Sequence, residues 1–420
     1  MEKIIFFIFI SFSFVNIMHI FAYLIGANLY DIWQLKYNSK VGTKIRKRVR
    51  PLVSIIIPAH NEENGIIKTL ESACRSSVRK LQIIVIDDAS NDNTKKLVRQ
   101  FIANNPKKPV ELTYLRTNKG KAVALNHALK NRVRGEFVMT LDADSEIDKY
   151  AVRRALRYFN DPNVAGVAAN VRVKPRGSAI GLLQMLEHMV GYRSKKFYTI
   201  TNSEFIVGGV ASTYRFDVLK YVKFYDIDTQ TEDIGLSMKI ASLGNKAHRL
   251  IYASDVLAFT EGVPNTKALF KQRFRWKLGM IQNLIKYRRY LSSSNNKYSR
   301  SLTFYRYPMA FFSELMLLFE PLILIYVIFL TIKFMEPGFF IGAYVTINLY
   351  IAMVVMHDEH LNFRKRIATA LYLPVSYFVF YLMNAVQFVA IVRCLIDPKR
   401  LTLRKNISST WTSPERANSV

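Results

Sequence analysis

The sequence has few cysteines and lacks two common nucleotide-binding motifs. Its 420 residues include only two cysteines, Cys74 and Cys394, which lie far apart along the chain. A disulfide between them is not expected, and a reducing compartment such as the cytoplasm fits this usage. No G-x-G-x-x-G follows the first predicted strand, and no G-x-x-x-x-G-K-[ST] occurs. These absences argue against a dinucleotide oxidoreductase and a P-loop nucleotidase.

Long apolar stretches with few or no charges lie towards both ends of the chain, over lengths that suit a lipid bilayer. Residues 3–30 contain no charged side chain after Lys3 and predict a membrane-spanning helix. A cleaved secretory signal is the alternative, but a signal has a shorter apolar core and a small-residue cleavage site, which favours an uncleaved helix. Three more candidate spans lie at residues 309–332, 339–356 and 367–392.

Two basic segments without acidic residues lie near these apolar stretches. Segments 36–50 and 267–306 carry many Lys and Arg residues but no Asp or Glu, and the whole chain has a net charge of +29. Basic segments next to a membrane favour the cytoplasmic side and anionic head groups. We therefore expect membrane lipids as partners and no nucleic acid. The predicted localisation is the cell (inner) membrane, as a multi-pass protein with its N-terminus outside and its central domain in the cytoplasm.

This composition divides the chain into five predicted segments. They are an N-terminal transmembrane helix (1–35), a basic linker (36–50), a cytoplasmic domain (51–290), a C-terminal membrane region (291–398) and a basic tail (399–420). Four spans would return the tail to the outside, whereas its Lys and Arg residues favour the inside. Two solutions stay open: the first half of 309–332, with Glu314 and Glu320, lies at the interface, or Pro374 breaks the last segment.

The central domain shows alternating strand and helix patterns. Short apolar runs predict strands at 53–57, 81–86, 111–115 and 137–141. Helical spacing predicts helices at 63–76, 93–103 and 122–131, the first with Asn61 as its N-cap. Repeated strand–helix units imply an α/β fold with a doubly wound sheet, whose ligand site lies at the carboxyl ends of the strands. Residues 178–198 predict a further helix, either amphipathic on the surface or packed in the core.

Polar motifs follow three of the predicted strands. Asp142 and Asp144 form a D-x-D sequence, and an extended tripeptide would direct both carboxylates to one side. Oxygen ligands of this kind suit Mg²⁺ or Mn²⁺ shared with substrate phosphates, although a surface D-x-D also arises by chance. Asp88 can accept from a base or ribose group, and helix capping is its alternative. We favour the ligand role for Asp88.

Two further motifs stand at predicted helix starts. Lys121 precedes a helix, where exposed amides and its ammonium group would suit phosphate oxygens, and a solvated basic turn is the alternative. Glu232 and Asp233 open another helix, so one acid there can complement the helix dipole. The second acid can remove the proton from an acceptor hydroxyl as it attacks a sugar. We assign that base to Asp233.

Two motifs lie in or near the apolar helices. Gln272, Arg275 and Trp276 share one face of a predicted helix at 266–290. Arg suits a diphosphate and Trp suits a sugar ring, while an interfacial Trp is the alternative. The sequence His357-Asp358-Glu359-His360 suggests a metal site, but adjacent residues point in different directions on a helix. We therefore expect these four residues to contact head groups.

Taken together and in order, the motifs I-P-A-H-N-E-E, I-D-D-A-S, L-D-A-D, T-E-D and Q-R-F-R-W resemble the processive family 2 glycosyltransferases. The resemblance extends over residues 53–287 and is strongest to bacterial poly-N-acetylglucosamine synthases, with chitin, hyaluronan and cellulose synthases also similar. It implies a GT-A type fold with a mixed sheet and inverting transfer from a UDP-sugar donor to a polysaccharide acceptor, which the membrane helices export. The alternative is a non-processive transferase that adds one sugar to a lipid carrier.

The resemblance also implies roles for individual residues. The nucleotide-sugar site would comprise Pro58, His60, Glu62, Asp88, Lys121 and Asp142. Asp142 and Asp144 would hold Mg²⁺ or Mn²⁺, and Asp233 would be the catalytic base. The acceptor and diphosphate would contact Glu232, Gln272, Arg273, Arg275 and Trp276. Two residues depart from the family pattern, since His60 replaces a common Tyr and Ala89 a common Gly. The tail at 411–416 favours N-acetylglucosamine as the sugar, and a small accessory membrane subunit is an expected partner.

Overall fold

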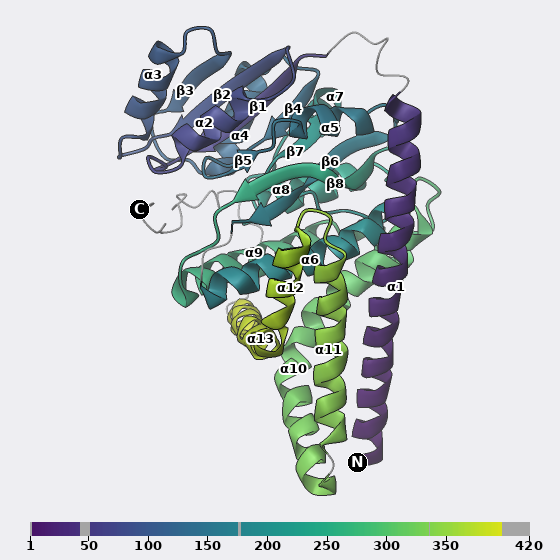
Figure 1. Cartoon of the computed structure of the whole chain (residues 1–420). Helices are drawn as coiled ribbons and strands as arrows, with labels where there is room; N and C mark the ends of the chain where they lie inside the picture. Colours follow the sequence, from purple (N-terminus) through teal and green to yellow (C-terminus); the bar gives the residue numbers. More distant parts are fainter. Residues whose placement is uncertain (1, 43–50, 175–177, 336, 397–420) are drawn as a thin grey trace.

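The computed structural model describes residues 2–42, 51–174, 178–335 and 337–396. The basic tail, including residues 411–416, and most of the predicted linker lie outside the described residues. Figure 1 shows an α/β domain above a stalk of apolar helices. The stalk consists of α1 (Glu2–Gly42), α10 (Tyr307–Phe334) and α11 (Gly338–Met356), which extend together away from the sheet.

One mixed sheet of eight strands organises the domain. In chain order its strands are β1 (Val53–Ala59), β2 (Leu81–Asp88), β3 (Val110–Leu115), β4 (Phe137–Thr140), β5 (Glu146–Ile147), β6 (Val164–Val173), β7 (Ser212–Arg215) and β8 (Arg249–Thr260). Their spatial order is β3-β2-β1-β4-β7-β6-β8-β5. Strands β3, β2, β1 and β4 are mutually parallel, whereas β7 runs antiparallel to β4 and β6. The predicted α/β class and all four predicted strands are confirmed.

The apolar runs become strands because both faces of the sheet are covered. In β1, Val53, Ile55 and Ile57 enter one core and Ile56 enters the other, as the alternation of a strand requires. The covering helices are α2 (Ile66–Cys74), α3 (Thr94–Asn104), α4 (Lys121–Asn131), α5 (Ala151–Tyr158), α7 (Phe216–Tyr221) and α8 (Glu232–Ala241). The predicted N-cap is wrong, because α2 begins after Gly65 and the Asn61 backbone has φ 54°.

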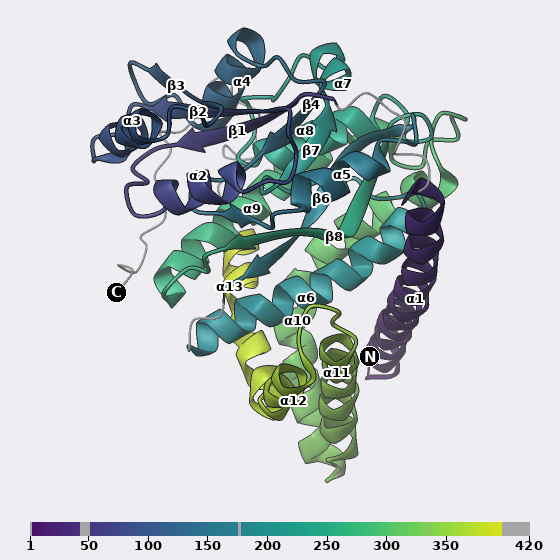
Figure 2. The ribbon, with the colours of Figure 1, turned by 45° about the horizontal axis from the view of Figure 1, so that its top comes forward.

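Two long helices lie between the sheet and the stalk. They are α6 (Ala179–Ile200) and α9 (Thr266–Lys286), and Figure 2 shows α6 crossing directly beneath β8. Helix α6 contacts α1, β6, β8 and α11, and its residues Leu183 and Leu186 are buried. The core-packed alternative for this segment is therefore the correct one.

Helix α1 is fastened to the domain through its C-terminal half. Tyr30 Oη donates to the Tyr252 carbonyl at 2.9 Å, and Gln34 Nε2 donates to Tyr158 Oη at 2.8 Å. The Tyr37 ring stacks on Tyr158 with 5.4 Å between centroids. The helix continues to Gly42, so the first part of the predicted linker is helical and holds the domain in a fixed position on the stalk.

Among the described residues, one helix is long and apolar enough to cross a membrane, and it lies in the C-terminal region; the predicted N-terminal span is not identified as a second one. The C-terminal helix extends over Ser301–Phe334 and has a mean hydropathy of 2.5 in its most apolar window. Helix α10 continues through Glu314 and Pro321 without a break, so its first half is not a separate interfacial helix. Shorter apolar helices occupy Phe340–Met356 and Tyr381–Ile396.

The last predicted span is divided, in agreement with the alternative that placed a break near Pro374. Helix α12 (Phe363–Leu371) ends just before α13 (Leu373–Ile396) begins. In Figure 1, α13 is seen almost end-on while α10 and α11 are seen from the side. Helix α13 therefore lies across the stalk rather than along it.

Candidate active site

The end of β2 carries a carboxylate that organises the loop between β3 and α4. Asp88 is fully buried, and its two oxygens accept from the backbone amides of Lys119 at 2.9 Å and Gly120 at 2.7 Å. Burial raises the pKa of Asp88, and these two hydrogen bonds partly oppose that rise. The carboxylate thereby fixes the turn that leads into Lys121 at the start of α4.

His60 connects the ends of β1 and β2. Its Nδ1 lies 2.8 Å from the Asp88 carbonyl oxygen, and its Nε2 lies 3.0 Å from Asn118 Nδ2. Pro58 stands two residues earlier in β1, and the backbone amide of buried Glu62 donates to Thr94 Oγ1 at 2.7 Å. The structure thus brings Pro58, His60, Glu62 and Asp88 to one sheet edge, as predicted.

Two non-glycine residues at this edge have left-handed backbones. The φ angle is 54° at Asn61 and 56° at Ala89. Asn tolerates this region and Gly prefers it, whereas an alanine Cβ is crowded there. Ala89 therefore has a backbone conformation that would suit glycine, the residue that Ala89 replaces in the family pattern.

Four charged side chains from three distant segments meet beside this edge. Lys121 Nζ lies 2.6 Å from Asp142 Oδ1 and 3.2 Å from Glu232 Oε1. A Cβ added at Gly209 would lie 3.1 Å from Lys121 Nζ and 3.5 Å from Asp233 Oδ2. The Gly209 backbone is therefore packed against the cluster, and a single ammonium group faces three carboxylates.

The charges in this cluster change the pKa values of Asp233 and Lys121. Burial and the neighbouring Glu232 carboxylate raise the pKa of Asp233 to about 6, while Lys121 partly opposes this rise. Burial alone would lower the pKa of Lys121, but the carboxylates of Asp142 and Glu232 raise it above its usual value. Lys121 therefore stays charged at neutral pH, and Asp233 is a carboxylate poised to take up a proton.

The D-x-D sequence forms a tight turn, not the extended tripeptide that we predicted. Strand β4 ends at Thr140, so the chain is free to turn after it. The Ser145 amide donates to the Asp142 carbonyl at 3.0 Å, and this hydrogen bond closes the turn. Ala143 and Ser145 are buried, whereas Asp142 and Asp144 are partly exposed. Both carboxylates thus remain accessible.

The donor set fits a cation shared with substrate. Among the described residues, no group of three or more His, Cys, Asp or Glu could hold a metal ion by itself. Mg²⁺ in phosphate-transfer sites is commonly held by one or two carboxylates plus substrate phosphates and water. Asp142 and Asp144 supply two such carboxylates, so these residues fit Mg²⁺ or Mn²⁺ brought with a diphosphate.

Helix α9 holds the turn that presents Glu232 and Asp233. Gln282 Oε1 accepts from the Gln230 amide at 2.9 Å, and Asn283 Nδ2 donates to the Thr231 carbonyl at 3.2 Å. A Cβ added at Gly279 would lie only 2.3 Å from Thr231 Oγ1, so the two helices approach closely there. The sequence did not predict that Gly279, Gln282 and Asn283 of α9 support this turn. The one hint was Gly279, because a glycine inside a predicted helix can mark a close approach between two elements.

The predicted acceptor residues of α9 point in different directions. Arg273 is buried, forms an ion pair with Glu187 of α6 and lies 4.1 Å from the Trp276 ring. Arg275 is exposed, whereas Gln272 and Trp276 are partly exposed. Within the described part of the chain, none of the four makes a hydrogen bond or ion pair with the Lys121 cluster. Their roles toward the acceptor stay predictions.

Comparison with known proteins finds relatives that cover most of the chain. Residues 54–222 match the model of Glycosyl transferase family 2. The chain is 27% identical over 381 residues to a poly-β-1,6-N-acetyl-D-glucosamine synthase of Staphylococcus epidermidis, covering 87% of this chain and 88% of that protein. The enzyme of the same name from Staphylococcus aureus (strain MSSA476) is 26% identical over 389 residues, with the same coverage.

One solved structure supports the fold. The mannosyltransferase PcManGT from Pyrobaculum calidifontis, in complex with GDP-Man and Mn²⁺, superposes with a TM-score of 0.54 at 20% identity, covering 90% of this chain and 99% of that one. The mixed sheet thus has the fold of the GT-A glycosyltransferases. Residues 54–222 thus resemble glycosyl transferase family 2, and the chain is a distant homologue of poly-β-1,6-N-acetylglucosamine synthases.

Proposed function

We propose that this protein is an inverting synthase that moves N-acetylglucosamine from UDP-N-acetylglucosamine onto the end of a growing β-linked polysaccharide. The observation that carries the proposal is Asp233, a carboxylate with a pKa of about 6 beside the Lys121–Asp142 pair. A general base works best when its pKa lies near the working pH. Asp233 removes the proton of the acceptor hydroxyl as that oxygen attacks the sugar.

The donor's diphosphate would lie against Lys121, Asp142 and Asp144. When bound, Mg²⁺ or Mn²⁺ held by the two aspartates neutralises the charge that develops on the departing diphosphate. Lys121 is already close to Asp142 and supplies a second positive charge for the phosphate oxygens. Asp88 shapes this site by holding the 119–120 loop that leads into Lys121. The names of the curated relatives support N-acetylglucosamine as the sugar.

The acceptor would approach from the side of α9. Trp276 is partly exposed and offers an apolar ring face to a sugar, with Arg275 and Gln272 on the same helix for polar contacts. Helix α9 also contacts α8, which carries Asp233, and α13 of the membrane region. A chain held on α9 would therefore lie between the catalytic base and the apolar helices through which we propose its export.

The arrangement of the helices suggests a membrane topology with three crossings. We assign α1, α10 and α11 as spans, because they extend together along the stalk (Figure 1). Helix α13 lies across them and is assigned to the interface. Three crossings that begin outside leave both the catalytic domain and the basic tail in the cytoplasm, which agrees with the positive-inside rule.

The test is UDP release by the detergent-purified full chain with Mg²⁺ or Mn²⁺. UDP-N-acetylglucosamine, UDP-glucose and UDP-glucuronate are offered separately, and the product is sized. We expect release with UDP-N-acetylglucosamine alone and a high-mass product that hexosaminidase degrades. The assay is repeated in native membranes, which retain any small accessory subunit.

Matched variants locate the reaction. Asp233→Asn should abolish transfer, whereas Asp217→Asn, an exposed acid in the first turn of α7, should retain it. A product that is entirely a single-sugar lipid would overturn the polymer synthase in favour of transfer to a lipid carrier. Unaltered transfer by Asp233→Asn would remove Asp233 from the mechanism.

A further inference from the structure

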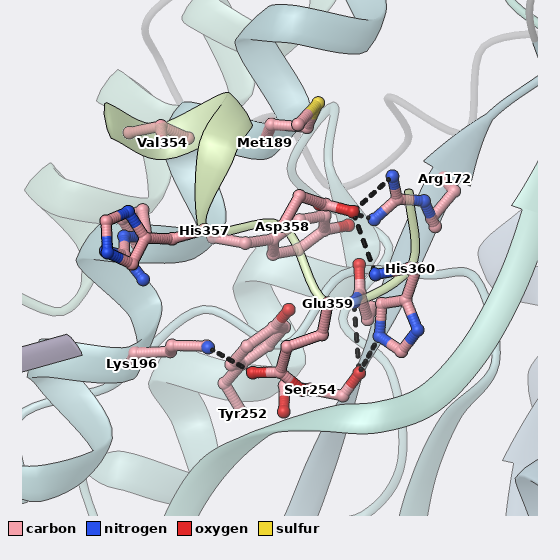
Figure 3. A pocket seen from close by; sticks show the side chains of 13 residues that line it. Arg172, Met189, Lys196, Tyr252, Ser254, Val354, His357, Asp358, Glu359 and His360 are labelled. Carbon is pink, nitrogen blue, oxygen red and sulfur yellow. Dashed lines mark hydrogen bonds and ion pairs between the residues drawn. The ribbon is translucent and has the colours of Figure 1, made fainter. Parts of the chain in front are cut away.

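A pocket separate from the candidate active site lies where the stalk meets the domain. It is open to solvent and is lined by residues of β6, α6, β8, the end of α11 and the turn that follows α11. Figure 3 shows that the turn at residues 357–360 forms one wall of this pocket. The catalytic residues assigned above do not line it.

Ion pairs fasten this turn to the domain. Arg172 donates to both carboxylate oxygens of Asp358 at 2.8 and 3.1 Å, and Lys196 lies 3.1 Å from Glu359 (Figure 3). His360 Nε2 lies 3.2 Å from the Ser254 carbonyl oxygen. The acids of this motif therefore pair with protein cations, and within the described residues the motif belongs to no metal-binding group.

Arg193 is the lining cation that lacks a close acidic partner. The side chain is buried at 6% exposure, and its nearest ion pair joins Nη1 to Asp31 Oδ2 at 3.9 Å. The same Asp31 carboxylate accepts a shorter hydrogen bond from Lys196. Among the described residues, neither Arg193 Nε nor Asn170 Oδ1 has a hydrogen-bond partner. A guanidinium group buried with so little compensation is costly, and an anion beside it would remove that cost.

The pocket has an apolar side as well as a polar side. Met189 and Val354 lie together on one side, and Lys196, Tyr252 and Ser254 lie on the other (Figure 3). Val354 belongs to α11, whose outward residues Ile347, Leu349 and Met353 are exposed and apolar. A ligand that fits must therefore combine a small polar, anionic group with an apolar part that can follow α11.

We propose that this pocket binds the phosphodiester head group of a membrane lipid, with Arg193 as its main contact and the acyl chains against α11. A phosphodiester offers two oxygens to the guanidinium group, which is the geometry that arginine recognises best. The proposal goes beyond sugar transfer and depends only on the proposed placement of α11 in the membrane. A lipid seated here would contact α6 and the β6–β8 pair, so its binding would stabilise the domain on its stalk.

The test is a thermal-shift titration of the detergent-purified, delipidated full chain. The probes are dioctanoyl phosphatidylglycerol, dioctanoylglycerol without a phosphate, and soluble glycerol 3-phosphate. A ligand that binds only the folded state raises the unfolding temperature with its concentration. We expect a saturable rise with the phospholipid and none with the other two compounds, and native mass spectrometry should detect one bound phospholipid.

Three variants test the site itself. Arg193→Gln should weaken phospholipid binding about tenfold or more, the usual result of losing a charged hydrogen bond. His357→Trp should also block binding from the exposed rim without altering the core. Arg364→Gln removes an exposed charge from α12 that does not line the pocket, and this variant should bind normally. Unchanged binding by both pocket variants, or an equal shift with glycerol 3-phosphate, would overturn the proposal.

Discussion

Lys121 Nζ lies 2.6 Å from Asp142 Oδ1, so the cation at the start of α4 pairs with the carboxylate assigned to the metal. A diphosphate carrying Mg²⁺ or Mn²⁺ would compete for both partners of this ion pair. Asp142 would hold the divalent ion, and the Lys121 ammonium group would then be available to the phosphate oxygens. Donor binding and the release of this ion pair are therefore coupled.

Lys121→Gln should lower kcat/KM for the nucleotide sugar by about 10²–10³-fold, because the developing charge on the diphosphate loses a positioned cation. Lys121 also lowers the pKa of Asp233, so its removal should move the acid limb of the pH–rate profile to higher pH. Steady-state UDP release between pH 5 and 8 measures both effects. Lys130→Gln changes an exposed lysine at the end of the same helix and should match the parent enzyme. A variant with lower activity but the same acid limb would contradict the coupling.

The pH dependence of transfer should report Asp233. Its pKa is raised to about 6, and only the ionised carboxylate can accept the hydroxyl proton. The rate should therefore be on a plateau above pH 7, half-maximal near pH 6 and about tenfold lower at pH 5. Donor binding measured at each pH serves as the control. A rate that stays flat from pH 5 to pH 7.5 would show that Asp233 does not act as the base.

Ala89→Gly should stabilise the protein by about 1 kcal/mol, because the residue has a φ of 56° that costs an alanine but not a glycine. The change in unfolding midpoint in urea measures it. Ala103→Gly, at an exposed position in helix α3, is the matched control and should destabilise by about 1 kcal/mol. Two glycine substitutions of the same sign would contradict the backbone explanation.

Gly279→Ala should reduce transfer without removing any charged group. The added methyl would lie 2.3 Å from Thr231 Oγ1 and would push α9 away from the turn that holds Glu232 and Asp233. We expect a loss of kcat of about tenfold or more, since small misplacements of catalytic groups have large effects. Gly191→Ala in α6 meets nothing within 4 Å and should be neutral or stabilising. Equal activity of the two variants would show that the close approach is unimportant.

The strand-end motifs were predictable because local rules decide them. An apolar run followed by Pro58 or Asp88 predicts a strand that ends at the ligand edge, and the structure agrees. The direction of Asp142 and Asp144 was not predictable by the same rule. The chain turns immediately after β4, so strand alternation no longer applies.

Tertiary contacts decide what sequence spacing could not. Gln282 and Asn283 look like ordinary helix residues, yet they bind the 230–231 backbone only because α9 crosses beside α8. The break between α12 and α13 was expected from Pro374, but the crosswise direction of α13 depends on its packing against α9 and α10. Helical spacing likewise grouped Gln272, Arg275 and Trp276, and it could not show that their neighbour Arg273 is buried.

Arg273 and Arg275 should therefore respond differently to the same substitution. Arg273→Gln removes a buried charged hydrogen bond and leaves the partly exposed Glu187 without its partner, which should cost about 2 kcal/mol. Arg275→Gln removes an exposed guanidinium group and should leave the unfolding midpoint unchanged while lowering kcat/KM about tenfold or more. Urea unfolding and UDP release on both variants separate the two effects. If Arg275→Gln transferred sugar normally while Arg273→Gln lost transfer without losing stability, the buried arginine would be the one that serves the reaction.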